Sequence, residues 1–209
     1  MFITIEGIEG GGKTTQVGLL AAALQARKLA VRITREPGGT RLGEEIRGLL
    51  LHSATRVGRL AELFLILADR AEHVEGLIRP ALRAGDIVLC DRFSDSTLAY
   101  QAYGRELPLD AVRTVESVAR QGLRPDLTFV LDCPVDLGLA RTRRRRGSAA
   151  ADRFEAQDAA FHERVRRGFL ALAGEDPQRI VVIDGSRPAE EVHRAVLAAS
   201  GERLGISWR

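Results

Sequence analysis

The chain alternates short apolar runs with longer segments whose apolar residues recur at helical spacing. The apolar runs predict strands at residues 2–6, 29–35, 87–90, 127–131 and 180–183. Because helix-length segments separate them, successive strands are expected to run parallel, with helices covering both faces of the sheet. The pattern therefore predicts an α/β fold in which a parallel sheet lies between two helical layers.

The segments between the strands predict helices. Pro80 is expected to bend or end a long helix in the first half of the chain, and Gly122 is expected to cap a later one. No internal repeat or linker interrupts the alternation, and 209 residues suffice for one buried core, so residues 1–209 are expected to form one domain. The predicted helices are 13–27, a short one ending near residue 51, 57–84, 95–103, 109–121, one from about 135 into an arginine run, 154–173 and 188–199.

Composition narrows the class of protein and its expected location. With 45% hydrophobic and 28% charged residues, the chain has the composition of an ordinary globular protein. Its longest apolar stretch, 63–68, is too short to cross a bilayer, and MFITIEG lacks the pattern of a secretory leader, so a cytoplasmic protein without membrane contact is expected. In that reducing compartment Cys90 and Cys133, at the ends of apolar runs, are expected to be buried thiols.

A glycine-rich stretch after the first predicted strand carries the first chemical signal. GIEGGGKT, residues 7–14, fits the pattern GxxxxGK[ST] and lies between a strand and a helix, as this motif requires. Glycines let the backbone wrap around a polyphosphate, Lys13 can reach its outer phosphates, and Thr14 can hold magnesium. A glycine-rich turn that only opens a helix is the alternative, which the pattern and its context disfavour. The predicted ATP-binding residues are Gly7, Ile8, Glu9, Gly10, Gly11, Gly12, Lys13, Thr14 and Thr15.

An acidic residue ends the apolar run IVLCD. Asp91 occupies the position at which P-loop folds place a carboxylate near magnesium. A helix-capping aspartate is the alternative, and Asp91 alone does not decide between the two. A P-loop alone also does not distinguish a switch, a motor and a kinase, so the function has to be inferred from further residues.

Five sequence segments are more informative when they are taken together. In chain order they are IEGIEGGGKTTQ, TREPGGT, ADRAEHV, CDRFSDSTLAYQ and DRFE, and they span residues 5–155. This combination resembles the thymidylate kinases, P-loop enzymes that transfer a phosphoryl group from ATP to dTMP in dTTP biosynthesis. The resemblance implies a P-loop NTPase-type fold with a five-stranded parallel sheet, a mobile lid and a homodimer. It also implies ATP and magnesium as cofactors, and dTDP and ADP as products.

The resemblance further implies roles for individual residues. Arg92 would clamp the acceptor phosphate, and Asp91 would assist Thr14 in holding magnesium. Glu9 would accept a hydrogen bond from a sugar hydroxyl of the acceptor, which explains a carboxylate inside an anion-binding loop. Tyr100 would underlie the deoxyribose and exclude a 2'-hydroxyl, and Thr97 would face the edge of thymine. The implied substrate-binding residues are Glu9, Glu36, Pro37, Ile66, Arg70, Arg92, Ser96, Thr97, Tyr100 and Gln101.

The helix expected to carry Arg70 raises two questions. Without the resemblance, Asp69, Arg70, Glu72 and His73 would be interpreted as the solvated face of that helix. The family commonly has an aromatic residue four positions before this arginine, where this chain has Ile66. Either Ile66 packs the base more weakly than an aromatic ring, or another aromatic residue, Phe64 or Phe93, stacks on it.

An arginine run followed by small residues predicts the lid, at about residues 141–155. Phosphoryl transfer mainly requires positioning and charge, so arginines are the expected tools. A solvated basic helix end and a nucleic-acid patch are the alternatives. Lys13 and Arg92 are expected to be catalytic, with one of Arg143, Arg145 and Arg153 acting from the lid. Asp152 and Glu155 could anchor the closed lid or contact the acceptor sugar.

Two other functions compete with dTMP phosphorylation. A kinase for another nucleotide such as dUMP is close, because one methyl group contributes only about 1 to 3 kcal/mol to discrimination. A P-loop switch or nucleic-acid-binding protein is less compatible, since it leaves DRFSDSTLAYQ without a purpose and the net charge is only +3. Small-molecule substrates and no nucleic acid are therefore expected. His52, His73, His162 and His193 show no metal-ligand spacing and are interpreted as surface or packing residues.

Overall fold

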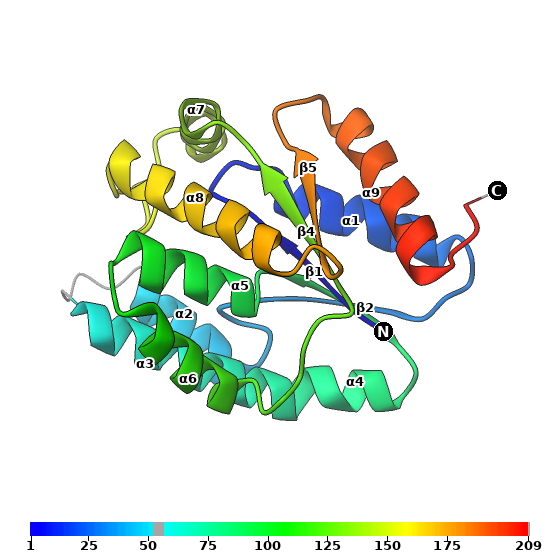
Figure 1. Cartoon of the computed structure of the whole chain (residues 1–209), viewed down its shortest axis with the longest axis horizontal. Helices are drawn as coiled ribbons and strands as arrows, with labels where there is room; N and C mark the ends of the chain where they lie inside the picture. Colours follow the sequence, from blue (N-terminus) through cyan, green and yellow to red (C-terminus); the bar gives the residue numbers. More distant parts are fainter. Residues whose placement is uncertain (52–56, 209) are drawn as a thin grey trace.

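A five-stranded parallel sheet forms the centre of the molecule (Figure 1). The structure is a computed structural model that describes residues 1–51 and 57–208. The strand order is β2-β3-β1-β4-β5, and each neighbouring pair runs parallel. The strands are β1 (Phe2–Glu6), β2 (Val31–Arg35), β3 (Ile87–Asp91), β4 (Leu127–Asp132) and β5 (Ile180–Asp184). The predicted parallel α/β sheet is confirmed.

Helices connect the strands, as the alternating pattern predicts. Two of the helical segments, η1 and η2, have the wider turns of a π-helix and continue directly from the α-helix before them. The segments are α1 (Lys13–Gln25), α2 (Arg41–Leu51), α3 (Arg59–His73), η1 (Val74–Ile78), α4 (Arg79–Arg83), α5 (Ser94–Thr97), η2 (Leu98–Gly104), α6 (Leu109–Ala119), α7 (Val135–Arg146), α8 (Ala159–Glu175) and α9 (Ala189–Leu204).

The two faces of the sheet bury different helices. Because side chains along a strand alternate between faces, Ile3 and Ile5 of β1 point to one layer, where they pack with Leu20 of α1 and Val196 of α9. On the opposite face Val130 of β4 belongs to a cluster formed with α3, α6, η2 and α8. Figure 1 shows α1 and α9 on one side of the sheet and α3, α6 and α8 on the other. The three-layer architecture is therefore confirmed.

Several predicted boundaries differ from the structure for local reasons. The chain runs as continuous helix from Arg59 to Arg83 and does not end at Pro80. The wide turn η1 ends two residues before this proline, which lacks the N–H that a regular helix would use. The strand predicted at 29–35 begins at Val31, because the Leu29 amide instead closes α1 by donating to the Leu24 carbonyl.

The helix predicted to begin at 154 begins at Ala159 instead. Its N-cap is Asp158, whose carboxylate accepts from the Phe161 amide at 2.7 Å. The preceding residues form turns, in which Asp152 accepts from the amides of Phe154 and Glu155. Short-range side-chain acceptors thus keep the segment after the arginine run out of the helix.

Two simpler predictions can also be compared with the fold. Cys90 and Cys133 are buried and free, as expected. Among the described residues, none of the helices has both the length and the apolar character needed to traverse a membrane.

The carboxyl ends of the parallel strands lie at one edge of the sheet, and Glu6, Arg35 and Asp91 end their strands there. In open α/β sheets this edge is the usual place for a ligand.

Candidate active site

The glycine loop between β1 and α1 has a backbone that side chains would disrupt. Gly7, Gly10 and Gly12 have φ values of 134°, 72° and 92°. A β-carbon at Gly7 would also lie 2.6 Å from the carbonyl oxygen of Leu131. These glycines therefore allow the tight loop that a phosphate-binding motif needs, and α1 begins directly after it at Lys13.

Lys13 is folded back onto this loop. Its Nζ donates to the Ile8 carbonyl at 2.8 Å, and the side chain is buried. Burial, together with the positive charge of Arg92, lowers the pKa of Lys13 to about 8. The amine has to leave the Ile8 carbonyl to reach a bound phosphate.

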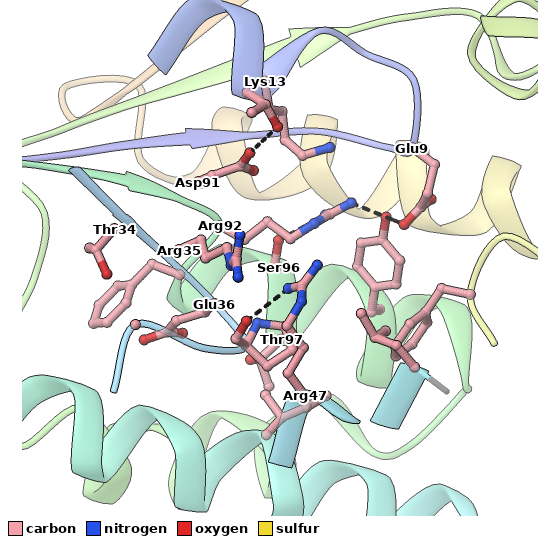
Figure 2. A pocket seen from close by; sticks show the side chains of 18 of the residues that line it. Glu9, Lys13, Thr34, Arg35, Glu36, Arg47, Asp91, Arg92, Ser96 and Thr97 are labelled. Atoms are coloured by element: carbon pink, nitrogen blue, oxygen red, sulfur yellow. Dashed lines mark hydrogen bonds and ion pairs between the residues drawn. The ribbon is translucent and has the colours of Figure 1, made fainter. Parts of the chain in front are cut away.

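Thr14 and Asp91 meet at the ends of α1 and β3. The Thr14 hydroxyl donates to the Asp91 carboxylate at 2.6 Å (Figure 2). The helix that follows, α5, has no side-chain N-cap bond. The alternative interpretation of Asp91 as a helix-capping aspartate is therefore wrong. No group of three or more His, Cys, Asp or Glu side chains suited to a metal occurs in residues 1–51 and 57–208. A hydroxyl and one carboxylate still fit Mg²⁺, which usually keeps waters and takes further oxygens from substrate phosphates.

Glu9 forms a second polar centre, opposite Lys13. Its Oε1 accepts from Arg92 Nη2 at 3.0 Å and from the Tyr100 hydroxyl at 2.6 Å, while its Oε2 lies 3.2 Å from Nδ1 of His162. Burial alone would raise the pKa of Glu9, but the attraction of Arg92 and of the other neighbouring groups outweighs it and holds the pKa well below its usual range. Glu9 is therefore an ionised acceptor at neutral pH.

A buried ion pair lies beneath the other end of the site. Arg70 donates through Nε and Nη2 to Oε2 of Glu36 at 3.0 and 2.7 Å, and through Nη1 to the Thr97 hydroxyl at 2.7 Å. His73 bridges Glu36 Oε1 and the Thr34 hydroxyl at 2.9 and 2.6 Å. The interpretation of Asp69, Arg70, Glu72 and His73 as a solvated helix face is wrong for three of them, because Asp69, Arg70 and His73 are buried, while Glu72 is exposed as expected.

These side chains line a cavity of about 570 Å³ (Figure 2). Every residue that the resemblance assigned to the acceptor lies on its wall, and Lys13, Thr14 and Asp91 form its phosphate-facing end. The acceptor residues concerned are Glu9, Glu36, Pro37, Ile66, Arg70, Arg92, Ser96, Thr97, Tyr100 and Gln101. The structure thus gathers residues from five segments of the chain around one space.

A second cavity, of about 320 Å³, adjoins the outer side of the glycine loop. Gly10, Gly11, Gly12 and Thr15 line it together with residues of α7 and of the segment between β5 and α9. Gly10 and Arg145 line both cavities. The two spaces therefore meet at the loop and at one arginine of the predicted lid.

The lid arginines occupy different environments. Arg145 and Arg146 pair with Glu155 at 3.2 and 3.6 Å, which ties α7 to the segment before α8. Arg143 is exposed and Arg153 is partly buried, and neither lines either of the two cavities. Of the three predicted candidates, the geometry favours Arg145.

Comparison with known proteins agrees with this geometry. A family model described as thymidylate kinase matches residues 5–196. The chain belongs to the thymidylate kinase family. It is 54% identical to a thymidylate kinase of Desulfovibrio desulfuricans over 199 residues, covering 92% of this chain and 91% of that protein. It is 48% identical to a thymidylate kinase of Trichlorobacter lovleyi over 210 residues, covering 99% of each.

A solved structure of the same family has the same fold. The crystal structure of thymidylate kinase from Ehrlichia chaffeensis superimposes with a TM-score of 0.77 at 37% identity, and the match covers 95% of this chain and 97% of that one. The family therefore accounts for the fold of this chain.

The structure distinguishes the three residues that the sequence offered for packing against the base, namely Phe64, Ile66 and Phe93. Ile66 lines the larger cavity, as the thymidylate kinase motif implies. Phe64 is 52% exposed and is absent from the wall of that cavity, so it does not replace the missing ring. Phe93 lines the cavity, but its ring is buried against Phe2 at 4.9 Å between centroids and under Arg70. Weaker packing by Ile66 is therefore the prediction that we retain.

Sequence reasoning missed several residues of the site. Arg35 and Arg47 line the larger cavity, and Phe154 reaches it from the predicted lid. Arg35 belongs to the quoted TREPGGT segment, so its positive charge within that motif could have identified it as a residue of the site. Arg47 gave no comparable signal, because its place depends on how α2 folds back over Pro37, whose carbonyl accepts from Arg47 Nη1 at 2.8 Å.

Two histidines also belong to this site. His73 and His162 are fully buried and each contacts a carboxylate of the larger cavity, so both do more than fill space. His193 is partly buried on α9, in agreement with a packing residue. His52 lies outside the described residues. A helical stripe of apolar residues that includes position 162 was a usable signal, since a polar residue in such a stripe is buried and needs a partner.

Proposed function

We propose that this chain transfers the γ-phosphoryl group of ATP to dTMP, giving ADP and dTDP. The observation that carries the proposal is the meeting of two cavities at the glycine loop and Arg145, one lined by the acceptor residues of the thymidylate kinase motifs. Membership of the family supplies the substrate class. The whole chain acts as one P-loop kinase domain, with a mobile lid at about residues 141–155.

The larger cavity holds dTMP. Glu9 is ionised and accepts a hydrogen bond from the sugar, and Tyr100, held by Glu9, underlies the deoxyribose. The Arg70 guanidinium donates to Glu36 and to the Thr97 hydroxyl in the cavity wall. Arg70 therefore fixes these two side chains at the base-facing end of the cavity, and its guanidinium is not free to bind the base directly. Arg92 is near the glycine loop and binds the acceptor phosphate, with Arg35 and Arg47 adding positive charge to the same wall.

The smaller cavity and the glycine loop hold ATP. The loop amides and the start of α1 bind its phosphates, and Lys13 exchanges the Ile8 carbonyl for a phosphate oxygen. Thr14 and Asp91 would hold magnesium. When bound, this ion offsets the charge of the phosphate oxygens and orients them.

Catalysis then depends on positioning and on positive charge. The acceptor phosphate is already a nucleophile, so the chain supplies no strong base and instead surrounds the transferring group with Lys13, Arg92 and Arg145. Arg145 lines both cavities, which supports it over Arg143 and Arg153 as the lid residue. Closure of the lid excludes water and completes this set.

The chain is also proposed to form a homodimer. Large apolar side chains are exposed on three helices that pack side by side, namely Leu49 on α2, Leu60 and Phe64 on α3, and Val118 on α6, which is 73% exposed. Adjacent exposed apolar residues of this kind mark interaction surfaces. Light scattering after size exclusion should give twice the chain mass, and Val118→Arg should lower it, whereas a monomeric wild type would contradict the dimer. A cytoplasmic location stays a prediction.

A coupled assay of ADP release tests the reaction. With ATP and magnesium present, dTMP should support saturable ADP release, and dUMP should be used roughly 10- to 200-fold less efficiently if the pocket recognises the methyl group. Equal use of both would make the chain a less selective kinase. Absence of dTMP-dependent ADP release, combined with salt-sensitive DNA binding, would favour the P-loop nucleic-acid protein instead.

A further inference from the structure

Helix α8 places a buried imidazole against the glycine loop. His162 is 0% exposed, and its Nδ1 lies 3.2 Å from Oε2 of Glu9. Neither ring nitrogen has a hydrogen-bond partner within the described part of the chain, and neither has Oε2 of Glu9. Buried polar atoms without partners are costly, so the pairing of these two orphaned groups requires an explanation.

The position of His162 is fixed by close helix packing. A β-carbon at Gly168 would lie 2.7 Å from the ring of Tyr103, and one at Gly104 would lie 2.8 Å from the ring of Phe161. α8 and η2 therefore approach each other more closely than other residues would allow. His162 follows Phe161 and cannot shift along the helix axis without breaking this contact.

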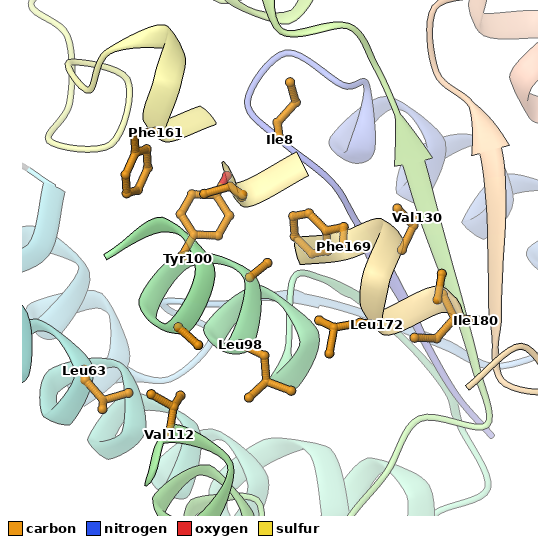
Figure 3. Packing of buried hydrophobic residues seen from close by; sticks show 14 of the residues in the cluster. Ile8, Leu63, Leu98, Tyr100, Val112, Val130, Phe161, Phe169, Leu172 and Ile180 are labelled. Atoms are coloured by element: carbon orange, nitrogen blue, oxygen red, sulfur yellow. The ribbon is translucent and has the colours of Figure 1, made fainter. Parts of the chain in front are cut away.

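The same packing surrounds the partner of Glu9. The Tyr100 ring lies between Phe161 and Phe169 of α8, with edge-on centroid distances of 6.1 and 6.2 Å (Figure 3). Phe154, from the segment before α8, contacts the same ring at 5.6 Å. α8 thus holds both the tyrosine that donates to one oxygen of Glu9 and the histidine that faces the other.

The two oxygens of Glu9 are used differently. Oε1 accepts from Arg92 and Tyr100, whereas Oε2 is buried and lies 3.2 Å from Nδ1 of His162. Arg92 and Lys13 already supply positive charge beside Glu9. Nδ1 is the ring nitrogen of His162 that lies near the carboxylate, so an N–H at this place can orient Glu9.

We propose that His162 is a positioning residue, which holds the buried oxygen Oε2 of Glu9 and so orients the carboxylate to accept the 3'-hydroxyl of an acceptor nucleotide in the larger cavity. The inference rests on the proposed function, because it requires dTMP in the larger cavity. The 3'-hydroxyl is the only hydroxyl group that remains on the deoxyribose of dTMP. His162 itself does not touch the phosphates or the transferring group.

A substrate and variant cycle tests this role. We would measure kcat/KM for dTMP and for its 3'-deoxy analogue in the wild type, His162→Asn and His162→Leu. Asn keeps an N–H near the place of Nδ1, whereas Leu has a similar size and no donor. The wild type should prefer dTMP by roughly tenfold or more, the effect of a hydrogen bond to a charged group. Leu should lose most of this preference, Asn should retain it, and KM for ATP should change little.

If the His162→Leu variant fails to fold, a comparison of His162→Asn with His162→Gln tests the same role. His162→Gln carries its N–H at the place of Nε2, so it should lose the preference that Asn retains, with similar unfolding midpoints for the two. An unchanged preference in Leu, or equal preferences in Asn and Gln, would overturn the inference. So would a wild type that phosphorylates dTMP and its analogue equally. A wild type inactive on dTMP would overturn the proposed function and this inference together.

Discussion

Arg92 has an unfavourable backbone conformation, and hydrogen bonds hold its side chain in place. Its φ is 72°, a left-handed value that non-glycine residues rarely adopt. The guanidinium donates to the Gly7 carbonyl at 3.0 Å, to the Ser96 hydroxyl at 3.2 Å and to Glu9 at 3.0 Å. Backbone strain of this kind is typical of functional sites, where surrounding contacts maintain it. The geometry agrees with a residue that has to point at one place in the cleft.

Replacing Arg92 by alanine should therefore cripple the reaction. Removing an arginine that stabilises the charge of a transferring phosphoryl group lowers turnover by about a thousandfold or more. Arg92→Lys should recover only part of the loss, because lysine keeps the charge but not the two-pronged donor. Steady-state kinetics with dTMP and ATP give the answer. Near-normal turnover of the alanine variant would remove Arg92 from the proposed role.

Ile66 offers a test of the base-facing wall. Ile66→Phe should lower KM for dTMP, since stacking on a base contributes roughly 1 to 3 kcal/mol and isoleucine supplies only part of that contact. The side chain is half-buried and lines the cavity, so a ring can reach the same space. KM for ATP serves as the internal control and should stay the same. An unchanged or raised KM for dTMP would contradict the stacking account.

Asp69 should make stability depend on pH. Burial and the negative charge of Glu36 raise the pKa of Asp69 to about 8, from an ordinary value near 3.8. The folded state then binds a proton that the unfolded state releases between these values, so the free energy of unfolding falls as pH rises from about 4 to 8. One such group contributes at most about 1.4 kcal/mol per pH unit.

Asp69→Asn removes this titration while keeping an oxygen for the Gly38 amide, which donates to Asp69 at 2.9 Å. Denaturant titrations at pH 5, 6, 7 and 8 should show a shallower decline for the variant than for the wild type. Some decline should remain, because burial also raises the pKa of Glu6 to about 7. Parallel curves for the two proteins would refute the role given to Asp69.

At the scale of elements, the lid helix is coupled to the glycine loop by direct backbone contact. A β-carbon at Gly10 would collide with the carbonyl of Gly138 in α7, and one at Gly138 would lie 2.6 Å from the carbonyl oxygen of Glu9. α7 carries the lid arginines, and Gly10 belongs to the phosphate-binding loop. A displacement of α7 therefore changes the loop itself.

Gly138→Ala should lower kcat/KM for both substrates, because the added methyl group pushes Glu9 and the loop away from α7. Gly48→Ala is the matched control, since Gly48 also lies within a helix and a β-carbon there meets nothing within 4 Å. The control should keep full activity and gain about 0.5 to 1 kcal/mol of stability from its better helix propensity. Equal activities of the two variants would disprove the coupling.

The elements also show what local sequence can predict. The strands and most helices follow from their apolar runs and periodicity, because the sheet is buried between two helical layers and the helices bury apolar residues in its two clusters. The start of α8 does not, since it depends on the Asp158 cap and on the turn that Asp152 stabilises. Phe154, where the predicted helix began, lies in these turns and contributes to the wall of the larger cavity.

In the whole molecule, the residues that the motifs assigned to the acceptor line the larger cavity, while the partners that the fold brings to them were harder to predict. Arg47 and His162 lie outside the quoted motifs, each in the helix that follows one, and the packing of α2 and α8 brings them to the cleft. Arg145 could not be distinguished from Arg143 and Arg153 by spacing, because the choice depends on the position of α7 over the glycine loop. Sequence therefore predicts the chemistry of the site better than its supporting contacts.

One continuous cleft is proposed to bind ATP and dTMP end to end. Calorimetric titration with a compound that joins adenosine and thymidine through five phosphates tests this arrangement. We expect one molecule bound per chain, with a Kd about a hundredfold or more below that of dTMP, because binding of the second nucleotide becomes intramolecular. A Kd no lower than that of either nucleotide alone, or two molecules bound per chain, would contradict a shared cleft.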